Sequence, residues 1–154
     1  LFIGAAATGF TAYAASMAAS RFSGDWLRSR FGGAELVRGS ALLAAAGLIL
    51  ALALPLPILA ILGFALVGLG LANLVPVFFG AAGRAGGQSA ATNIAAVATI
   101  GYSGFVVGPP FIGFVADLST LQLALGLIVL ACLAVALFAR VAEPAARRAT
   151  APRS

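Results

Sequence analysis

The sequence predicts an all-α membrane protein, a polytopic bundle of transmembrane helices. Of its 154 residues, 62% are hydrophobic and only 8% are charged, whereas soluble domains average about 45–50% apolar and about 25% charged residues. A water-soluble chain of this length could not bury so much apolar surface. The charged residues are also confined to short segments between long uncharged runs. The composition therefore disfavours a disordered chain, a nucleic-acid-binding module and a disulfide-stapled secreted domain.

The uncharged runs set the expected number of spans, because about 20 helical residues cross the hydrocarbon core. A long run over 39–83 holds two spans divided at Pro55-Leu56-Pro57, and 85–116 is one long, interrupted helix. We expect a transmembrane domain over 1–140 with five spans, at about 1–20, 37–54, 58–79, 89–116 and 121–139.

The arginines predict how this domain is oriented. They lie in the first connection, in the third connection and in the tail: Arg21, Arg28, Arg30 and Arg38; Arg84; Arg140, Arg147, Arg148 and Arg153. An even number of spans separates each pair of these segments, so all nine arginines fall on one face. The positive-inside rule makes that face cytoplasmic. We expect a multi-pass protein of the inner (plasma) membrane with a cytoplasmic C-terminus.

The two ends of the chain carry further expectations. Residues 141–154 are expected to form a disordered, basic cytoplasmic tail, which either serves only to fix orientation or also touches anionic lipid headgroups. The chain begins at Leu1, inside an apolar span and without a basic n-region, which is not typical of a signal peptide. This start indicates the C-terminal part of a longer polytopic protein.

Polar side chains distinguish the expected spans, because such groups are costly in lipid unless a partner or water satisfies them. Spans 37–54 and 121–139 carry almost none and are expected to be peripheral. The other three are expected to line something polar, through Thr8, Thr11, Tyr13 and Ser16; Asn73; and Thr92, Asn93, Thr99, Tyr102 and Ser103.

The span 89–116 has two contrasting faces at helical periodicity. Thr92, Thr99 and Tyr102 share one face, and three glycines share nearly the opposite one. Two of the glycines form a GxxxG step, which arises by chance in a glycine-rich chain or lets two helices approach closely. The prolines that follow are expected to bend or break the helix. The predicted packing and bend residues are Gly101, Gly104, Gly108, Pro109, Pro110 and Gly113.

Two stretches carry a family resemblance: Gly24-Asp25-Trp26-Leu27-Arg28-Ser29-Arg30-Phe31-Gly32 and Gly104-Phe105-Val106-Val107-Gly108-Pro109-Pro110-Phe111-Ile112-Gly113. The first is similar to the acidic-basic-glycine loop of the major facilitator superfamily (MFS), and the second to its glycine-proline motif. The chain thus resembles helices 8–12 of an MFS-type C-terminal six-helix domain. The resemblance implies a cytoplasmic gating loop formed by Gly24, Asp25, Arg28, Arg30 and Gly32.

The loop departs from the family pattern at Trp26, because a basic residue usually follows the acid directly. Asp25 and a nearby arginine either form a charge-assisted contact between two helix ends or an exposed ion pair worth about 0–1 kcal/mol.

The resemblance implies part of a secondary active transporter, a permease or efflux pump that moves a small solute by alternating access together with a missing N-terminal half of the same polypeptide. The eighth, tenth and eleventh helices of such a transporter would face its central pathway. They correspond to the three spans that carry polar side chains. The candidates for substrate contact are Asn73, Asn93, Thr99 and Tyr102. For each, the alternative is an interhelical hydrogen bond that only holds the bundle together.

Other functions are less well supported by the residues. No span has an acid in its interior, so a proton-coupling group is expected in the missing N-terminal portion. An enzyme is not expected, because the chain has no histidine, one cysteine (Cys132) and no acid pair near a nucleophile. No cofactor, metal or nucleic-acid partner is expected; the partners are the bilayer and a solute. The alternative is a non-transporting membrane scaffold or receptor-like subunit whose small-residue faces bind another subunit.

Overall fold

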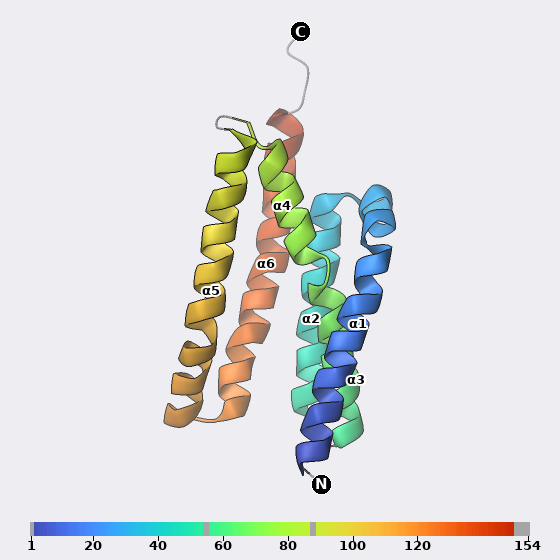
Figure 1. Ribbon diagram of the computed structural model, residues 1–154, viewed down its shortest axis with the longest axis vertical. Coiled ribbons are helices and arrows are strands. Elements are labelled where there is room, and N and C mark those ends of the chain that lie inside the picture. The colour runs from blue at the N-terminus through green and yellow to red at the C-terminus, as the bar shows by residue number, and fades with distance from the viewer. Residues whose placement is uncertain (1, 54–55, 87–88, 150–154) are drawn as a thin grey trace.

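The computed structural model describes residues 2–53, 56–86 and 89–149, and the side chains of these except at 2–6, 25, 27–28 and 140–149. The described residues form helices and no strand (Figure 1): α1 (Phe2–Phe31), α2 (Gly33–Ala53), α3 (Pro57–Leu71), α4 (Leu74–Arg84), α5 (Ala90–Leu118) and α6 (Leu121–Ala149). The predicted all-α polytopic bundle is confirmed.

Four helical stretches in the described part of the chain are long and apolar enough to cross a membrane. They are Gly33–Ala53, Pro57–Arg84 (α3 and α4 together), Ala90–Leu118 and Leu121–Ala139. They match four of the five expected spans. The expected span 1–20 lies in α1, part of whose side chains are outside the described residues, and it stays a prediction.

The first connection is much shorter than expected, because α1 continues through the charged segment to Phe31. A single residue, Gly32, separates α1 from α2, and its φ of 78° is in the left-handed region that glycine adopts without steric cost. Charged residues end an apolar run without ending a helix, since Arg and Leu are good helix formers. The residues expected to form a loop between Arg21 and Phe31 are therefore helical.

The expected third span is divided into α3 and α4 at Ala72 and Asn73. The Ala72 N–H still donates to the Gly68 carbonyl at 3.2 Å, and the Val77 N–H donates to the Asn73 carbonyl at 3.2 Å. Pro76 has no N–H, so the Ala72 carbonyl lacks the donor that a continuous helix would supply. One missing donor near a residue with a polar side chain is enough to interrupt the helix.

The last two helices are more continuous than expected. Helix α5 runs without a break through Pro109 and Pro110, so the prolines do not divide it. Helix α6 continues to Ala149, so the backbone of 141–149 is helical where a disordered tail was expected. Alanine and arginine, which dominate that stretch, have high helix propensity. Residues 150–154 lie outside the described part of the chain.

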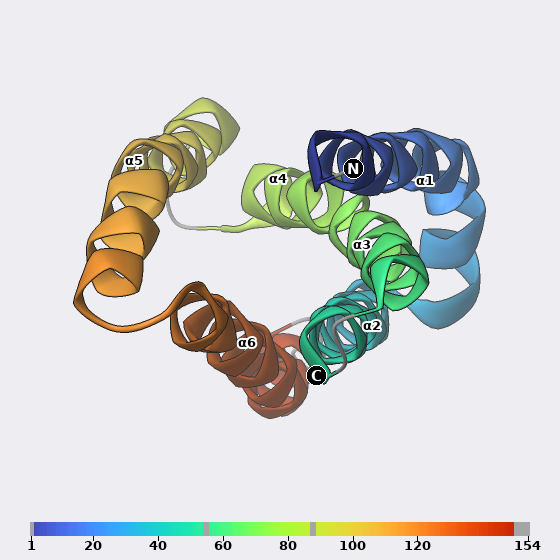
Figure 2. The ribbon, with the colours of Figure 1, turned by 90° about the horizontal axis from the view of Figure 1, so that it is seen from below.

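The packed part of the molecule is centred on α2, which lies between α3 and α6 (Figure 2). Its buried residues include Leu36 and Val37, which contact Val77 of α4, and Ala45 and Leu48, which contact Val129 of α6. The expectation that this helix is peripheral, away from a polar pathway, stays a prediction. Its small side chains allow neighbouring helices to come close without any polar contact.

Glycines make the closest helix contacts possible. A Cβ on Gly47 of α2 would lie 2.6 Å from the Gly63 carbonyl oxygen of α3, and one on Gly70 would lie 2.8 Å from the Ala44 backbone nitrogen. A Cβ on Gly68 would collide with the backbone of Tyr13 in α1. Helix α3 is thus held against both α1 and α2 by backbone-to-backbone packing.

Candidate functional site

Asn73 is a buried polar residue at the α3–α4 break, with 4% of its surface exposed. Its Nδ2 donates to the Ser20 Oγ of α1 at 3.1 Å, and that hydroxyl donates to the Leu69 carbonyl of α3 at 3.2 Å. Gly24, one turn along α1, faces the Asn73 Oδ1 so closely that a Cβ would have no room. We call the contact between Ser20 and Asn73 the Ser20–Asn73 bridge.

Two cavities meet at Asn73. The larger, of about 540 Å³, lies between α1, α2 and α3, and Ser20, Ser23, Ser40 and Asn73 contribute its polar groups together with Glu35. The smaller, of about 270 Å³, is lined by Arg21, Gly24, Leu36, Asn73, Val75, Pro76 and Val77. Asn73 and Leu36 line both, so they form the partition between the two spaces.

Asn93, the second predicted solute contact, joins α5 to the preceding connection. Its Nδ2 donates to the Ala85 carbonyl at 2.9 Å. Ser89 caps the same helix end, because its Oγ accepts from the Thr92 N–H at 3.2 Å. These contacts join the start of α5 to the connection that precedes it. A hydrogen bond of this kind is the expected alternative to solute contact for Asn93.

Thr99 bonds to its own helix. Its Oγ1 donates to the Ala95 carbonyl at 2.9 Å, and the Ser103 Oγ donates to the Thr99 carbonyl at 2.8 Å. A hydroxyl that donates to the carbonyl four residues earlier has its hydrogen bond within its own helix and needs no partner on a neighbouring helix. The side chains remain exposed on α5.

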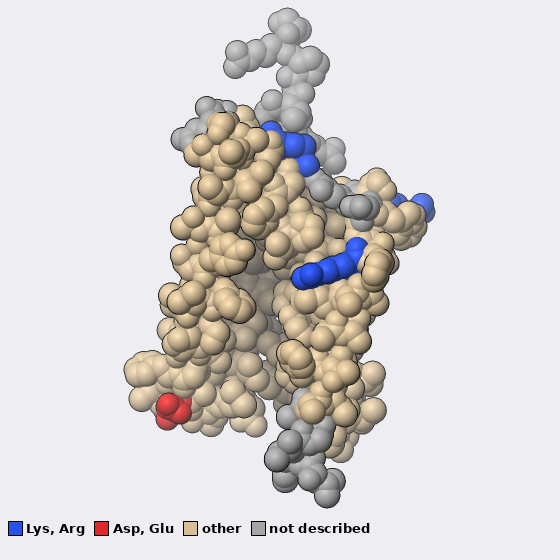
Figure 3. Space-filling model, in the orientation of Figure 1, with Lys and Arg blue, Asp and Glu red and all other residues tan. Residues whose placement is uncertain are grey.

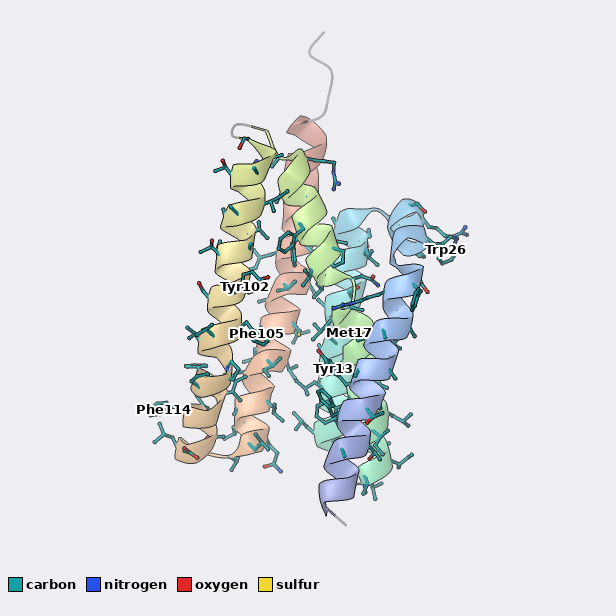
Figure 4. All side chains as sticks on the ribbon, viewed as in Figure 1. Tyr13, Met17, Trp26, Tyr102, Phe105 and Phe114 are labelled. Carbon is teal, nitrogen blue, oxygen red and sulfur yellow. The ribbon has the colours of Figure 1, made fainter. Side chains whose placement is uncertain are left out.

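Tyr102 lies at a cavity of about 230 Å³ between α4 and α5, shared with Val75, Phe79, Ala98, Gly101 and Phe105. The side chain is 71% exposed. Figure 4 shows Tyr102 and Phe105 on one side of α5 and Phe114 on the other. Tyr102 is therefore the predicted solute contact that lies in an open, mainly aromatic and aliphatic recess.

The structure does not bring the four predicted solute contacts together. Asn73 faces α1, Asn93 faces the α4–α5 connection, Thr99 bonds within α5, and Tyr102 lies beside α4. Their roles as substrate contacts stay predictions.

The glycines predicted to pack on α5 are not used for close helix packing in the described part of the chain. A Cβ on Gly101, Gly104, Gly108 or Gly113 would meet nothing within 4 Å. No described residue of α5 is buried. Sequence reasoning missed the glycines that do pack, Gly63, Gly68 and Gly70, although their spacing in one apolar run was a usable signal.

The predicted gating loop is helical except at Gly32, and the side chains of Asp25 and Arg28 lie outside the described residues. The Arg30 guanidinium carbon lies 5.8 Å from the centre of the Trp26 ring, within the range of a cation–π contact. The Ser29 Oγ donates to the Trp26 carbonyl at 2.8 Å. Trp26, the departure from the family pattern, thus has a basic partner one turn away.

The arginines lie toward one end of the bundle, where Glu35 in the first turn of α2 also lies. The α1–α2 connection, the α4–α5 connection and the C-terminal end of α6 lie at the same end (Figure 1). On the face drawn in Figure 3, the arginines lie toward that end, and the visible acidic group lies at the opposite one. Among the described residues, no three histidine, cysteine, aspartate or glutamate side chains are grouped to hold a metal ion.

Comparison with known proteins shows similarity to membrane transporters. The chain is 39% identical to an uncharacterised MFS-type transporter of Yersinia pestis over 88% of its own length and 35% of that protein. It is 34% identical to an uncharacterised transporter of Sinorhizobium fredii, over 88% of the chain and 36% of that protein. It is 42% identical to membrane protein MosC of Rhizobium meliloti, over 71% of the chain and 27% of that protein.

The chain spans about a third of the length of the curated relatives it matches. No protein-family model and no solved structure matches it. The similarity nevertheless covers most of the chain and includes both stretches that resemble the family motifs. The chain is a multi-pass membrane segment related over most of its length to transporters of the major facilitator superfamily.

Proposed function

We propose that the chain is part of the C-terminal half of a secondary active transporter that moves a small solute by alternating access. The observation that carries this proposal is the similarity to an MFS-type transporter over 88% of the chain. An apolar recess at Tyr102, with a single hydroxyl, supports a neutral or amphipathic solute rather than a strongly charged one. Asn93, Thr99 and Ser103 use their polar side chains in hydrogen bonds within α5 or to the preceding connection.

The proposed partner of this segment is an N-terminal half of the same polypeptide, seated against α5. No described residue of α5 is buried, and its glycines leave open space where a second helix backbone can approach. A helix with no buried residue is stable when lipid surrounds it. Five spans, however, form only one side of an alternating-access pathway. The segment alone is therefore expected not to transport.

We place the arginine-bearing end of the bundle in the cytoplasm of the cell, with the protein in the inner (plasma) membrane. The positive-inside rule supports this orientation, because the arginine-bearing segments beside the α1–α2 junction, at the end of α4 and at the end of α6 lie at the same end of the bundle.

The test is a transport assay of the full-length protein in proteoliposomes, after a growth screen across sugars and drugs has identified a solute. Replacing Tyr102 by alanine should raise KM roughly tenfold, as expected when one ring contact to the solute is lost. Phe114→Ala is the matched control, because Phe114 is an exposed aromatic residue on the other side of the same helix.

An equal KM in both variants would place the solute elsewhere. Failure to move any solute, together with stoichiometric capture of another membrane subunit, would instead favour the scaffold function, for which the open glycine face of α5 is the supporting feature.

A further inference from the structure

The α3–α4 break has the construction of a hinge whose two sides are held very differently. Upstream, Gly68 and Gly70 fix α3 against the backbones of α1 and α2. Downstream, α4 leaves α3 at an angle (Figure 1) and packs mainly on α5. Its buried residues are Val77 and Ala82. Val77 packs on Leu36 and Val37 of α2, so α4 is held against the body by side-chain contacts, whereas α3 is held by backbone-to-backbone contacts with both of its neighbours.

The helix backbone offers little resistance at this point. Pro76 cannot donate to the Ala72 carbonyl, so one hydrogen bond across the break is missing. The Asn73 backbone has φ −99° and ψ −6°, close to the values of about −90° and 0° found at the third residue of a type I turn and away from those of a regular helix. A change of tilt at this residue requires no further helix hydrogen bond to be broken beyond the one from Val77 to Asn73.

The side chain of Asn73 borders free space. It lines two open pockets, of about 540 Å³ and 270 Å³, whose walls include exposed residues such as Glu35 and Arg21. What holds Asn73 between them is the hydrogen bond to Ser20, backed by the contact with Gly24.

We propose that the Ser20–Asn73 bridge holds the α3–α4 hinge in its present tilt, and that its release lets α4, together with α5, move against the α1–α2–α3 body. The two cavities supply the room for Asn73 to move without displacing other side chains. A buried amide without a hydrogen-bond partner is costly in lipid, so Asn73 must bond to another group when it leaves Ser20. The hinge therefore has a few discrete positions and does not vary continuously. The inference concerns helix positions and does not depend on which solute is carried.

The test measures distances between spin labels in the full-length protein in lipid nanodiscs, with Cys132 replaced by serine. One label pair joins Ala46→Cys of α2 to Ala81→Cys of α4, across the hinge. A reference pair joins Ala46→Cys to Leu62→Cys of α3, within the fixed body. All three labelled side chains are exposed.

Ser20→Ala and Asn73→Ala should each broaden or shift the 46–81 distance by on the order of 2 Å or more and leave the 46–62 distance unchanged. The double variant should do no more than either single one, because both remove the same contact. Gly24→Ala should act in the same direction, since its Cβ displaces Asn73 while both hydrogen-bonding groups remain. Ser103→Ala is the matched control, because that hydroxyl bonds only within α5.

An unchanged 46–81 distance in folded Ser20→Ala or Gly24→Ala protein would overturn the proposal. Equal broadening of the 46–62 distance would also overturn it, because it would indicate general loosening of the bundle. Absence of transport in every variant, with the expected distance changes, would contradict the proposed function and leave the hinge supported.

Discussion

Helices α2 and α5 show opposite relations between composition and burial. Helix α2 has one polar residue in its apolar run, Ser40, and contributes much of the buried core. Helix α5 carries five hydroxyl, amide or phenol side chains in its membrane stretch and contributes no described buried residue. The number of polar side chains on a membrane helix therefore does not predict how far that helix is buried against other helices of its chain. The bilayer is as apolar as the helices themselves.

The glycines sharpen the same comparison. Gly47 of α2 and Gly63, Gly68 and Gly70 of α3 lie where two backbones meet, whereas a Cβ on the glycines of α5 would meet nothing within 4 Å. If the comparison is sound, identical substitutions should have opposite consequences in the two regions. The α3 glycines determine how this segment packs, and the α5 glycines remain available for a helix from elsewhere.

The largest expected effect is that of Gly63→Ala in α3. Its Cβ would lie 2.7 Å from the Ala51 Cβ and 2.8 Å from the Ala51 backbone nitrogen, so α2 and α3 must separate. Overpacking of this kind costs about 1–3 kcal/mol of stability, to be measured as a lower unfolding temperature of the detergent-solubilised protein. Gly126→Ala in α6 is the control, because its Cβ meets nothing within 4 Å. Equal stability of the two variants would contradict the close packing of α3.

An intermediate effect is expected for Gly104→Leu in α5, and on a different quantity. The added side chain has open space in this chain, so the segment should retain its fold. If an N-terminal half packs on this face, transport by the full-length protein should fall roughly tenfold because two helices can no longer approach. Phe114→Leu, which adds no bulk on the same helix, serves as the comparison. Full transport by folded Gly104→Leu protein would mean that the glycine face binds lipid.

The smallest effects are expected from the polar groups of α5 that bond locally. Asn93→Ala removes the bond to the Ala85 carbonyl and should lower stability by about 1 kcal/mol. Thr99→Ala removes only a return bond to Ala95 and should stay within about 0.5 kcal/mol. Unfolding of the purified variants in a denaturing detergent series measures both. A larger loss for Thr99→Ala would indicate a contact beyond its own helix.

Hydropathy and proline positions predicted most of the fold. The four spans after the first appear where expected, with α3 beginning at Pro57 and α6 beginning at Leu121. The extent of α1 was not predictable from charge, because a helix can continue beyond the hydrocarbon core into a charged stretch. The break at Asn73 was only partly signalled by Pro76, since α5 contains two consecutive prolines and remains one helix.

The candidate site was less predictable than the fold. Asn73 was identified from its polarity in an apolar run, but its partner Ser20 is 53 residues away. Gly24 was identified through the family motif, whereas its position against Asn73 follows from how α1 crosses the break. The spacing of residues along one helix predicts which of them share a face. It does not predict which other helix that face contacts.

The amino-acid sequence by itself determined that this protein lies in a membrane, where four of its long apolar helical stretches lie along the chain, and that arginine is confined to the segments between apolar runs. These properties depend on composition and on distances along the chain, which the thickness of a bilayer converts directly into structure. Only the tertiary structure decided which helix is central, which glycines pack and what Asn73 contacts. Those outcomes depend on how closely backbones approach, and in lipid that is decided by van der Waals fit and paired polar groups and not by hydrophobicity.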